Sequence, residues 1–322
     1  MRKFIVPCLA VLAVAACGTT EDPTTGQEPT SSSGERITVT DSRGKEVVLD
    51  GPAERVAATE WNAVEHLVAL GVMPVGVSDI KGYGQWVSAE PLDDTPTDIG
   101  TRGEPSMDTL AQLDLDLVVV TDSLVEGALE QIEEDTPVIV LVGGDANDPI
   151  GEMWENVDIL AKATGTEDRA AEMRTEWDQK VADGRAAVAE AGADGTKVAF
   201  SDAYADSGSV SIRPFTEGSL IGAVLGELGF EDAWSMEGDP VYGLAQADVE
   251  GLTNLGDDVR FWYIANSAFG DPYADELADN AIWKNLPFVK AGHVHRFPDS
   301  IWMFGGPTSM AQLIDAAVDA VS

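Results

Sequence analysis

The residues that could carry out chemistry are few, and their scarcity limits what the chain can do. Its 322 residues include three histidines (His 3) and two cysteines (Cys 2). Both cysteines, Cys8 and Cys17, lie near the amino terminus, so the rest of the chain has no thiol that could serve as a nucleophile, a zinc ligand or half of a disulfide. Motifs typical of dinucleotide binding, phosphate-binding loops, serine hydrolases and zinc proteases are absent as well. These observations favour a binding protein over an enzyme.

The histidines offer one place where a metal could bind. His293 and His295 are two positions apart, which puts both side chains on one face of a strand, but a complete site needs a third or fourth ligand nearby. His66 lies among apolar residues of an expected helix, where a structural role is the simpler interpretation. A metalloenzyme that uses His293 and His295 stays open as an alternative, although we expect neither a bound metal nor a cofactor.

Aromatic residues in three loops are the positive signal for a binding site. Each group follows an expected strand and precedes an expected helix, at residues 83–86, 241–243 and 301–306. A single loop aromatic is more often half-buried packing, but three groups at the edges of lobes indicate a cleft. Aromatic clefts bind large, rigid, apolar ligands at low entropic cost. The candidate contacts are Trp86, Tyr242, Trp302 and Phe304.

Arg102 is the candidate for a polar contact with the ligand. It lies in a glycine-containing loop just before an expected helix, in a chain with 19 basic and 57 acidic residues and a formal net charge of -38. Its guanidinium offers a fixed fork of donors to clustered ligand oxygens. An ion pair with Glu104 or another surface carboxylate is the alternative. The acidic surface argues against a nucleic-acid partner and favours a neutral or cationic ligand.

Strands that alternate with helices are expected to position these residues in two α/β lobes. The first lobe covers residues 35–164 and the second covers residues 196–322, with helices expected at 248–255 and 308–321. Residues 165–195 hold a connecting helix of about 25 residues, which is long enough at 1.5 Å per residue to cross a lobe. Ligands of such sheets bind beyond the carboxyl ends of the strands, so we expect a ligand cleft between the lobes.

The first 34 residues do not belong to this fold. Residues 1–16 combine a positively charged start with an apolar stretch that is too short to span a bilayer, which is typical of a signal peptide. Cys17 follows two small residues, as in the lipobox of bacterial lipoproteins, and this resemblance implies cleavage before Cys17 and lipidation of its thiol. Residues 17–34 are rich in Thr, Ser, Pro, Gly and Glu, so we expect a flexible tether. The domain is therefore expected outside the cytoplasm, anchored to the cell membrane by lipid.

The folded part resembles the helical-hinge class of substrate-binding proteins of ABC importers, which serves ferric siderophores, haem and cobalamin. Residues 67–77, 104–110 and 113–118 carry the likeness, which extends over essentially residues 35–322. The resemblance implies two α/β lobes joined by one long helix, a ligand held between them, and delivery of that ligand to an importer permease by a monomer without enzymatic activity. In this class one acidic residue of each lobe meets arginines of the permease, and the matching positions are Asp108 and Glu250.

Within the class, the ferric hydroxamate-binding members are the most similar, through residues 86–92 and 99–105. The resemblance implies that Arg102 donates to hydroxamate oxygens of an assembled iron chelate, while Trp86, Tyr242, Trp302 and Phe304 contact its aliphatic rim. A tyrosine that these members carry after the strand that begins at Leu117 has no counterpart in residues 123–125. Cobalamin binders of the class tend to carry an aromatic residue where Arg102 stands, which favours a ferric hydroxamate. Cobalamin or haem is the alternative ligand. The sequence therefore predicts a lipoprotein that captures a ferric siderophore for import.

Overall fold

The computed structural model describes residues 36–122, 128–206 and 209–322. The predicted signal peptide, the predicted lipidation site Cys17, the tether and residues 123–125 therefore lie outside the described residues. Within the described ranges, no helix combines the length and the hydropathy needed to cross a bilayer. The description thus begins one residue before the first strand and runs to the carboxyl terminus.

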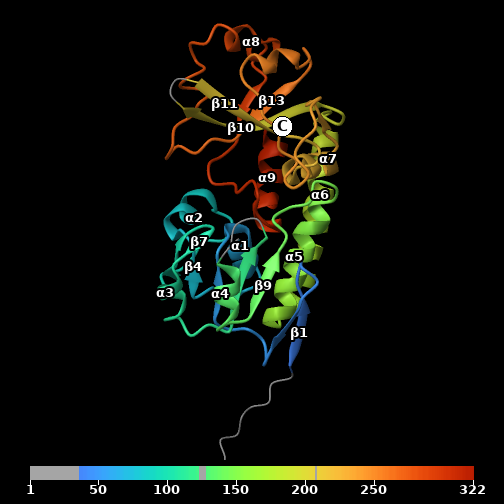
Figure 1. The fold of residues 1–322 in the computed structure, drawn as a ribbon. Helices are drawn as coiled ribbons and strands as arrows, with labels where there is room; N and C mark the ends of the chain where they lie inside the picture. Colours follow the sequence, from blue (N-terminus) through green and yellow to red (C-terminus); the bar gives the residue numbers. More distant parts are fainter. Residues whose placement is uncertain (1–35, 123–127, 207–208) are drawn as a thin grey trace, which may run out of the picture. The chain divides into compact units, whose positions relative to one another are not determined.

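The first lobe is built on a sheet of five parallel strands (Figure 1). They are β3 (Val56–Ala58), β4 (Gly76–Val77), β5 (Thr97–Asp98), β8 (Leu117–Thr121) and β9 (Val138–Leu141). Their order in the sheet is β5-β4-β3-β8-β9. Every residue of β8 and β9 is buried, which requires helices on both faces of the sheet and explains the unbroken apolar runs in the sequence.

Helices and two small hairpins complete the first lobe. The helices are α1 (Trp61–Ala69), α2 (Ile80–Trp86), α3 (Met107–Leu110), α4 (Leu129–Glu133) and α5 (Pro149–Thr164). The first hairpin consists of antiparallel β1 (Ile37–Thr40) and β2 (Glu46–Leu49). A second antiparallel pair, β6 (Gly100–Thr101) and β7 (Glu104–Pro105), carries Arg102 in its turn. Because this turn follows β5 directly, it holds Arg102 at the carboxyl edge of the parallel sheet.

The second lobe has a mixed sheet in which β10 (Lys197–Asp206) pairs antiparallel with β11 (Ser209–Phe215). The other strands pair parallel, in the order β11-β10-β13-β14, with β12 beside the start of β10. They are β12 (Glu231–Asp232), β13 (Arg260–Tyr263) and β14 (Val294–Arg296). The remaining elements are α7 (Leu220–Glu227), η1 (Gly251–Asn254), η2 (Trp283–Asn285), α8 (Pro287–Lys290) and α9 (Pro307–Asp319).

The long helix α6 (Glu167–Glu190) links the lobes and packs along α9 (Figure 1). Gly184 of α6 permits this close approach, because a Cβ there would lie 2.7 Å from Ile314 and 2.9 Å from Leu228. A single hydrophobic cluster includes Leu67 of α1, Trp177 of α6 and Phe200 of β10, so both lobes share one core. The predicted architecture of two α/β lobes and one long helix is confirmed, whereas the residue boundaries of the lobes stay a prediction.

Two expectations about local structure are wrong. Residues 83–86 were expected in a loop but belong to α2, where the side chain of Asp79 caps the helix by accepting from the N–H of Gly82 at 3.0 Å. The two glycines of α2 disfavour a helix, but packing of the buried Tyr83 overrides that local preference. The helix expected at residues 248–255 is one turn of 3-10 helix, Gly251–Asn254, and its buried residues Val249, Leu252 and Leu255 recur every three positions, which is the period of a 3-10 helix.

Candidate functional site

A cavity of about 850 Å³ opens at the carboxyl ends of strands in both lobes. In the first lobe its wall includes Glu60 just beyond β3, Thr121 at the end of β8 and Gly143 just beyond β9. In the second lobe it includes Asp202 on β10 and Ala265 just beyond β13. This edge of an α/β sheet is where the loops that follow the strands converge and where ligands bind. The volume is typical of sites for small molecules and chelates.

All five residues that the sequence predicts as ligand contacts line this cavity. Arg102 extends from the turn between β6 and β7, and Trp86 is the last residue of α2. The loop between β14 and α9 contributes Trp302 and Phe304, and the segment before η1 contributes Tyr242. Their assembly around one cavity follows from the fold, while their contact with a ligand stays a prediction.

Arg102 is held by an ion pair on the cavity wall. Its Nε and Nη2 donate to the carboxylate of Glu60, with the shortest contact 2.6 Å between Nη2 and Oε2. The guanidinium carbon also lies 4.2 Å from the ring centroid of Trp61 and 5.4 Å from that of Trp302. The alternative of a carboxylate partner is thus realised, although the partner is Glu60 and not Glu104. Such a planar, bidentate and stacked arginine is fixed in orientation.

Arg213 repeats this arrangement in the second lobe. Its Nε donates to Asp202 Oδ1 at 2.8 Å and its Nη2 to the other carboxylate oxygen, across the antiparallel pairing of β10 and β11. The guanidinium carbon lies 5.3 Å from the ring centroid of Phe304 and 5.6 Å from that of Phe215. Each lobe therefore supplies one arginine that pairs with a carboxylate and contacts an aromatic ring of the loop before α9.

The two carboxylates lie behind the two arginines. The side chains of Glu60 and Asp202 are 6% and 13% exposed, whereas those of Arg102 and Arg213 are 30% and 34% exposed. Burial raises the pKa of both carboxyl groups, and the facing guanidinium groups partly offset that rise. As long as the carboxyl groups are ionised, each pair is neutral as a whole. The arginines thus offer hydrogen-bond donors without a surplus of positive charge.

Further carboxylates on the wall strengthen this conclusion. Asp271 pairs with Arg296, whose Nε lies 3.0 Å from Oδ2. Glu276 also lines the cavity and has no ion pair among the described residues. The wall therefore carries no excess positive charge, which fits a neutral or cationic ligand better than an anionic one.

Four aromatic rings form a row across the cavity floor, each in edge-to-face contact with the next. Trp61 and Trp302 have ring centroids 5.0 Å apart, Trp302 and Phe304 5.2 Å apart, and Phe304 and Tyr242 5.5 Å apart. Their interplanar angles of 65°, 69° and 77° are the geometry that aromatic pairs prefer. The row gives the cavity a large apolar surface whose shape is set before any ligand arrives.

A buried carboxylate fixes the loop that carries Trp302 and Phe304. Glu65 of α1 accepts from the backbone N–H and hydroxyl of Ser309 and from the hydroxyl of Thr308, each at 2.8 Å, at the start of α9. Gly305 packs directly on this carboxylate, since a Cβ there would lie 2.4 Å from Glu65 Oε2. The glycine is therefore required where the loop meets α1. A carboxylate at a helix N-terminus also interacts favourably with the helix dipole.

The histidines lie outside the cavity wall. His66 is buried behind Gly306, where a Cβ would lie 2.6 Å from Nδ1, and burial lowers its pKa to about 4. His293 precedes β14 and His295 lies on it. In the parts of the chain that the structure describes, no group of three or more His, Cys, Asp or Glu is placed to hold a metal ion.

Other candidates from the sequence lie elsewhere. Tyr83 is buried and donates to the carbonyl of Glu90 at 2.6 Å, so its ring supports α2 and does not line the cavity. Asp108 in the first turn of α3 and Glu250 just before η1 are both exposed and do not line the cavity. Their predicted role in permease docking stays a prediction.

Sequence reasoning missed several residues of the wall. Glu60 and Trp61 lie just beyond β3. Because ligands of such sheets bind beyond the carboxyl ends of the strands, their position after an expected strand could have identified them. Arg213 shares with Arg102 only the scarcity of cations in the chain, since it lies within a strand and not in a glycine-containing loop. Its partner Asp202 and the loop residue Phe269 carry no comparable local signal.

Known proteins resemble the chain over both lobes. A family model described as periplasmic binding protein matches residues 56–301. The Fe(3+)-citrate-binding protein YfmC of Bacillus subtilis is 26% identical over 294 residues, which cover 91% of this chain and 88% of YfmC. The iron(3+)-hydroxamate-binding protein FhuD of Escherichia coli is 25% identical over 268 residues, which cover 83% of this chain and 86% of FhuD.

Solved structures share the fold. The siderophore-binding protein FhuD from Vibrio cholerae, bound to Fe3+ and Desferal, has a TM-score of 0.70 at 23% sequence identity. The superposition covers 83% of this chain and 97% of that chain. It therefore includes both lobes and the long helix.

Proposed function

Because the chain belongs to the periplasmic binding protein family, we propose that it captures a ferric siderophore, preferably a hydroxamate, outside the cytoplasm and delivers it to an ABC importer. The protein acts by binding and release, and iron is its cargo, enclosed in a chelate. The names of the relatives support a ferric ligand, since one is named for iron(3+)-hydroxamate and another for Fe(3+)-citrate. The same names give no support to cobalamin or haem.

The neutral arginine pairs are the observation that carries the choice of a hydroxamate. Three hydroxamate groups cancel the charge of ferric iron, so the chelate core is neutral, whereas ferric citrate and ferric catecholate complexes are anionic. An anionic chelate requires cations that are free to compensate its charge. Here Glu60 neutralises Arg102 and Asp202 neutralises Arg213. The cavity therefore suits a neutral chelate or one with a cationic tail.

Arg102 recognises the chelate oxygens in this proposal. Glu60 accepts from Nε and Nη2, so both N–H groups of Nη1 and the second N–H of Nη2 remain as donors for a ligand while the guanidinium keeps its orientation. The hydroxamate oxygens accept these N–H groups, and the aliphatic rim of the chelate packs on Trp86, Tyr242, Trp302 and Phe304. Arg213 is positioned to donate from the opposite lobe.

Delivery requires the protein to stay near its importer. Lipidation of Cys17 and the tether at residues 17–34 would hold the binding domain at the membrane surface, within reach of the permease. Exposed Asp108 and Glu250, one in each lobe, would meet arginines of the permease. Two relatives are named as lipoproteins, which supports the anchor.

Titration of the purified domain tests this function. Quenching of tryptophan fluorescence is measured with ferrioxamine B, ferrichrome, ferric citrate, haem and cobalamin, and with iron-free desferrioxamine as the control for recognition of the assembled chelate. We expect micromolar or tighter binding of at least one ferric hydroxamate and no saturable binding of iron-free desferrioxamine. Tight binding of haem or cobalamin without binding of any ferric siderophore would overturn the proposal.

A further inference from the structure

Phe269 is the most exposed of the large apolar side chains in the described part of the chain. Its exposure is 65%, compared with 56% for Tyr204 and 50% for Val48. Phe269 and Tyr204 both line the cavity, on its second-lobe side. An exposed aromatic ring lacks the stabilisation that burial provides. Exposed apolar surface beside a cavity is typical of a binding site, so the ring of Phe269 is a candidate contact for a ligand.

The ring of Phe269 stacks on Trp86 across the cavity mouth. Their centroids are 5.7 Å apart and their planes differ by 14°. Trp86 belongs to α2 of the first lobe, whereas Phe269 follows β13 of the second. Trp86 is itself fixed from behind by Trp302, at 6.1 Å in edge-to-face geometry. Two nearly parallel aromatic faces, one from each lobe, thus stand at the entrance.

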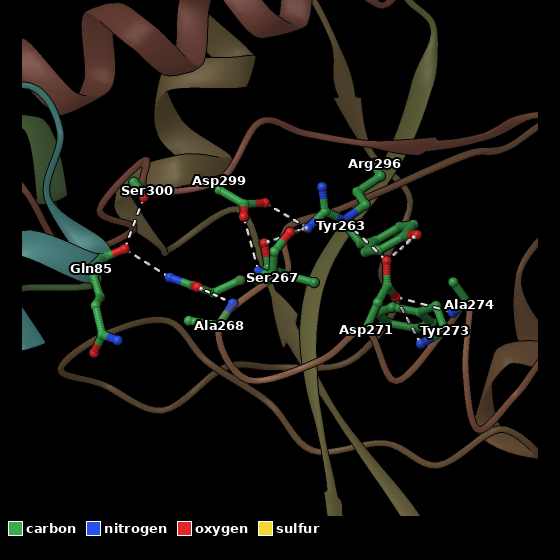
Figure 2. Close-up of polar contacts among 12 residues, drawn as sticks. Gln85, Tyr263, Ser267, Ala268, Asp271, Tyr273, Ala274, Arg296, Asp299 and Ser300 are labelled. Carbon is green, nitrogen blue, oxygen red and sulfur yellow. Dashed lines mark hydrogen bonds and ion pairs between the residues drawn. The ribbon is translucent and has the colours of Figure 1, made fainter.

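Phe269 is held at the tip of a tight turn that is bonded across the lobes. Its N–H donates to the carbonyl of Asn266 at 2.8 Å, and the side-chain oxygen of Asn266 accepts from the N–H of Ala268 at 2.9 Å. The amide nitrogen of Asn266 donates to the carbonyl of Gln85 at 2.7 Å, and the hydroxyl of Ser300 donates to the same carbonyl at 2.8 Å (Figure 2). Gln85 precedes Trp86, so both rings are anchored through one carbonyl.

Ion pairs and hydrogen bonds also fix the segments on either side of this turn. Arg296 pairs with Asp271 and Asp299, and Asp299 accepts from the N–H of Ser267 at 2.9 Å (Figure 2). Asp271 in turn accepts from the N–H groups of Tyr273 and Ala274. Hydrogen bonds on both sides of Phe269 therefore present its ring in a defined position, which is the arrangement expected of a recognition element.

We propose that Phe269 determines ligand specificity: its exposed ring, supported by stacking on Trp86, is an aromatic surface for the hydrocarbon arms of the chelate. This inference rests on the function proposed above. The rings of Phe269 and Trp86 already contact each other, so polymethylene arms that leave the cavity mouth pack on the exposed part of the Phe269 ring. A chelate whose arms are enclosed in a compact peptide ring gains little from this surface. Asn266 is a positioning residue, because its side chain bonds the turn that carries Phe269 to the carbonyl of Gln85 and to the N–H of Ala268.

The test compares two ferric hydroxamates of different shape, ferrioxamine B with linear arms and ferrichrome with a cyclic peptide. For Phe269→Ala we expect the affinity for ferrioxamine B to fall about 5–10-fold and that for ferrichrome to change less than about twofold, as befits loss of one aromatic contact. Phe269→Tyr should restore the wild-type ratio of the two dissociation constants. Val48→Ala, which shortens another exposed apolar side chain far from the cavity, should leave both affinities unchanged.

A second variant tests the anchor. Asn266→Asp keeps the acceptor for Ala268 but loses the donor to Gln85, so we expect the selectivity ratio to move in the same direction as in Phe269→Ala, by about twofold to threefold. An unchanged ratio in Phe269→Ala, or equal losses for both chelates, would overturn this role of Phe269 while leaving the proposed function intact. Failure of the wild-type protein to bind either chelate would instead overturn the proposed function.

Discussion

Nη2 of Arg102 lies 2.6 Å from a carboxylate oxygen of Glu60, and this buried carboxylate decides what the arginine can offer a ligand. Without Glu60, the guanidinium would carry a full positive charge into an apolar cavity and would favour an anion. With Glu60 behind it, the guanidinium donates hydrogen bonds from a neutral pair. Arg213 and Asp202 apply the same arrangement in the other lobe.

Loss of Arg102 should weaken binding of the chelate. We expect Arg102→Ala to lower the affinity for ferric hydroxamates about 10–100-fold, since a charge-assisted hydrogen bond contributes about 1.5–3 kcal/mol. Arg102→Lys, which keeps the charge but not the fork, should be intermediate. Fluorescence titration measures both. The double variant Arg102→Ala, Glu60→Ala controls for the unpaired buried carboxylate, and unchanged affinity in all three would exclude the proposed role of Arg102.

Removal of the charge on Glu60 should change the ligand class. In Glu60→Gln the guanidinium of Arg102 is no longer neutralised, so we expect affinity for ferric citrate to rise about 5–10-fold at low salt. Affinity for ferrioxamine B should stay within about twofold. The gain should shrink as salt is added.

Glu276→Gln is the matched control for this change, because Glu276 lines the same cavity but is exposed and has no ion pair among the described residues. Its effect on ferric citrate should be smaller than that of Glu60→Gln. Equal effects of the two variants would show that total charge, and not release of Arg102, governs selectivity.

Glu65 should contribute strongly to stability because it bonds the start of α9 from within the core. Glu65→Ala leaves the N–H and hydroxyl of Ser309 without their acceptor, and we expect a loss of about 3 kcal/mol in the free energy of unfolding. The thermal midpoint should fall by about 5–10 °C in calorimetry. Glu172→Ala, on an exposed face of α6, is the control and should change stability by less than about 0.5 kcal/mol.

Stability should depend on pH through Glu152. Burial, with nearby Glu155 and other acids, raises its pKa from 4.5 to about 7. The folded protein therefore binds a proton between these values that the unfolded chain does not, so this group's contribution to stability rises as pH falls from 8 toward 5. Glu152→Gln should be more stable than wild type at pH 8, by about 1 kcal/mol once solvent screening is allowed for, and equal to it near pH 4.

Urea unfolding at the two pH values measures this difference. His66 makes the opposite contribution, because its pKa of about 4 in the folded protein makes stability fall as pH drops below 6.5. This contribution is the same in wild type and in Glu152→Gln, so it cancels in the difference between their free energies of unfolding. If the free energies of unfolding of wild type and Glu152→Gln differ by the same amount at both pH values, Glu152 does not titrate in this range.

Charge reversal at the predicted docking positions should reduce transport of the siderophore without changing its affinity for the protein. We expect Asp108→Lys and Glu250→Lys to leave siderophore affinity unchanged, because neither residue lines the cavity. Uptake of radiolabelled iron chelate by cells that express the importer should fall strongly, since each variant opposes an arginine of the permease with a like charge. Asp168→Lys on α6 is a matched exposed control and should transport normally.

The parts of the fold that local pattern governs were predictable. β8 begins at Leu117, where the sequence predicts the start of a strand, because a short apolar run leaves few alternatives to a buried strand. The helix α2 was not predicted, since its two glycines hide a segment that only the cap of Asp79 and the packing of Tyr83 make helical.

The same distinction holds for the site. Arg102 stood out by its type and loop, but its partner Glu60 lies 42 positions earlier at the start of α1, and nothing local links the two. Phe269 follows no motif, and its exposure is a property of the assembled turn. Sequence could therefore name side chains that suit a ligand, but not the pairs that set their charge.

The comparison of ferrioxamine B with ferric citrate as ligands of the wild-type protein tests the central claim most directly. Both are titrated by tryptophan fluorescence under one set of conditions at low ionic strength. Neutral arginine pairs predict that ferrioxamine B binds at least about tenfold more tightly, a difference of about 1.4 kcal/mol. Tighter binding of ferric citrate would contradict the account, because it would mean that Arg102 and Arg213 act as free cations.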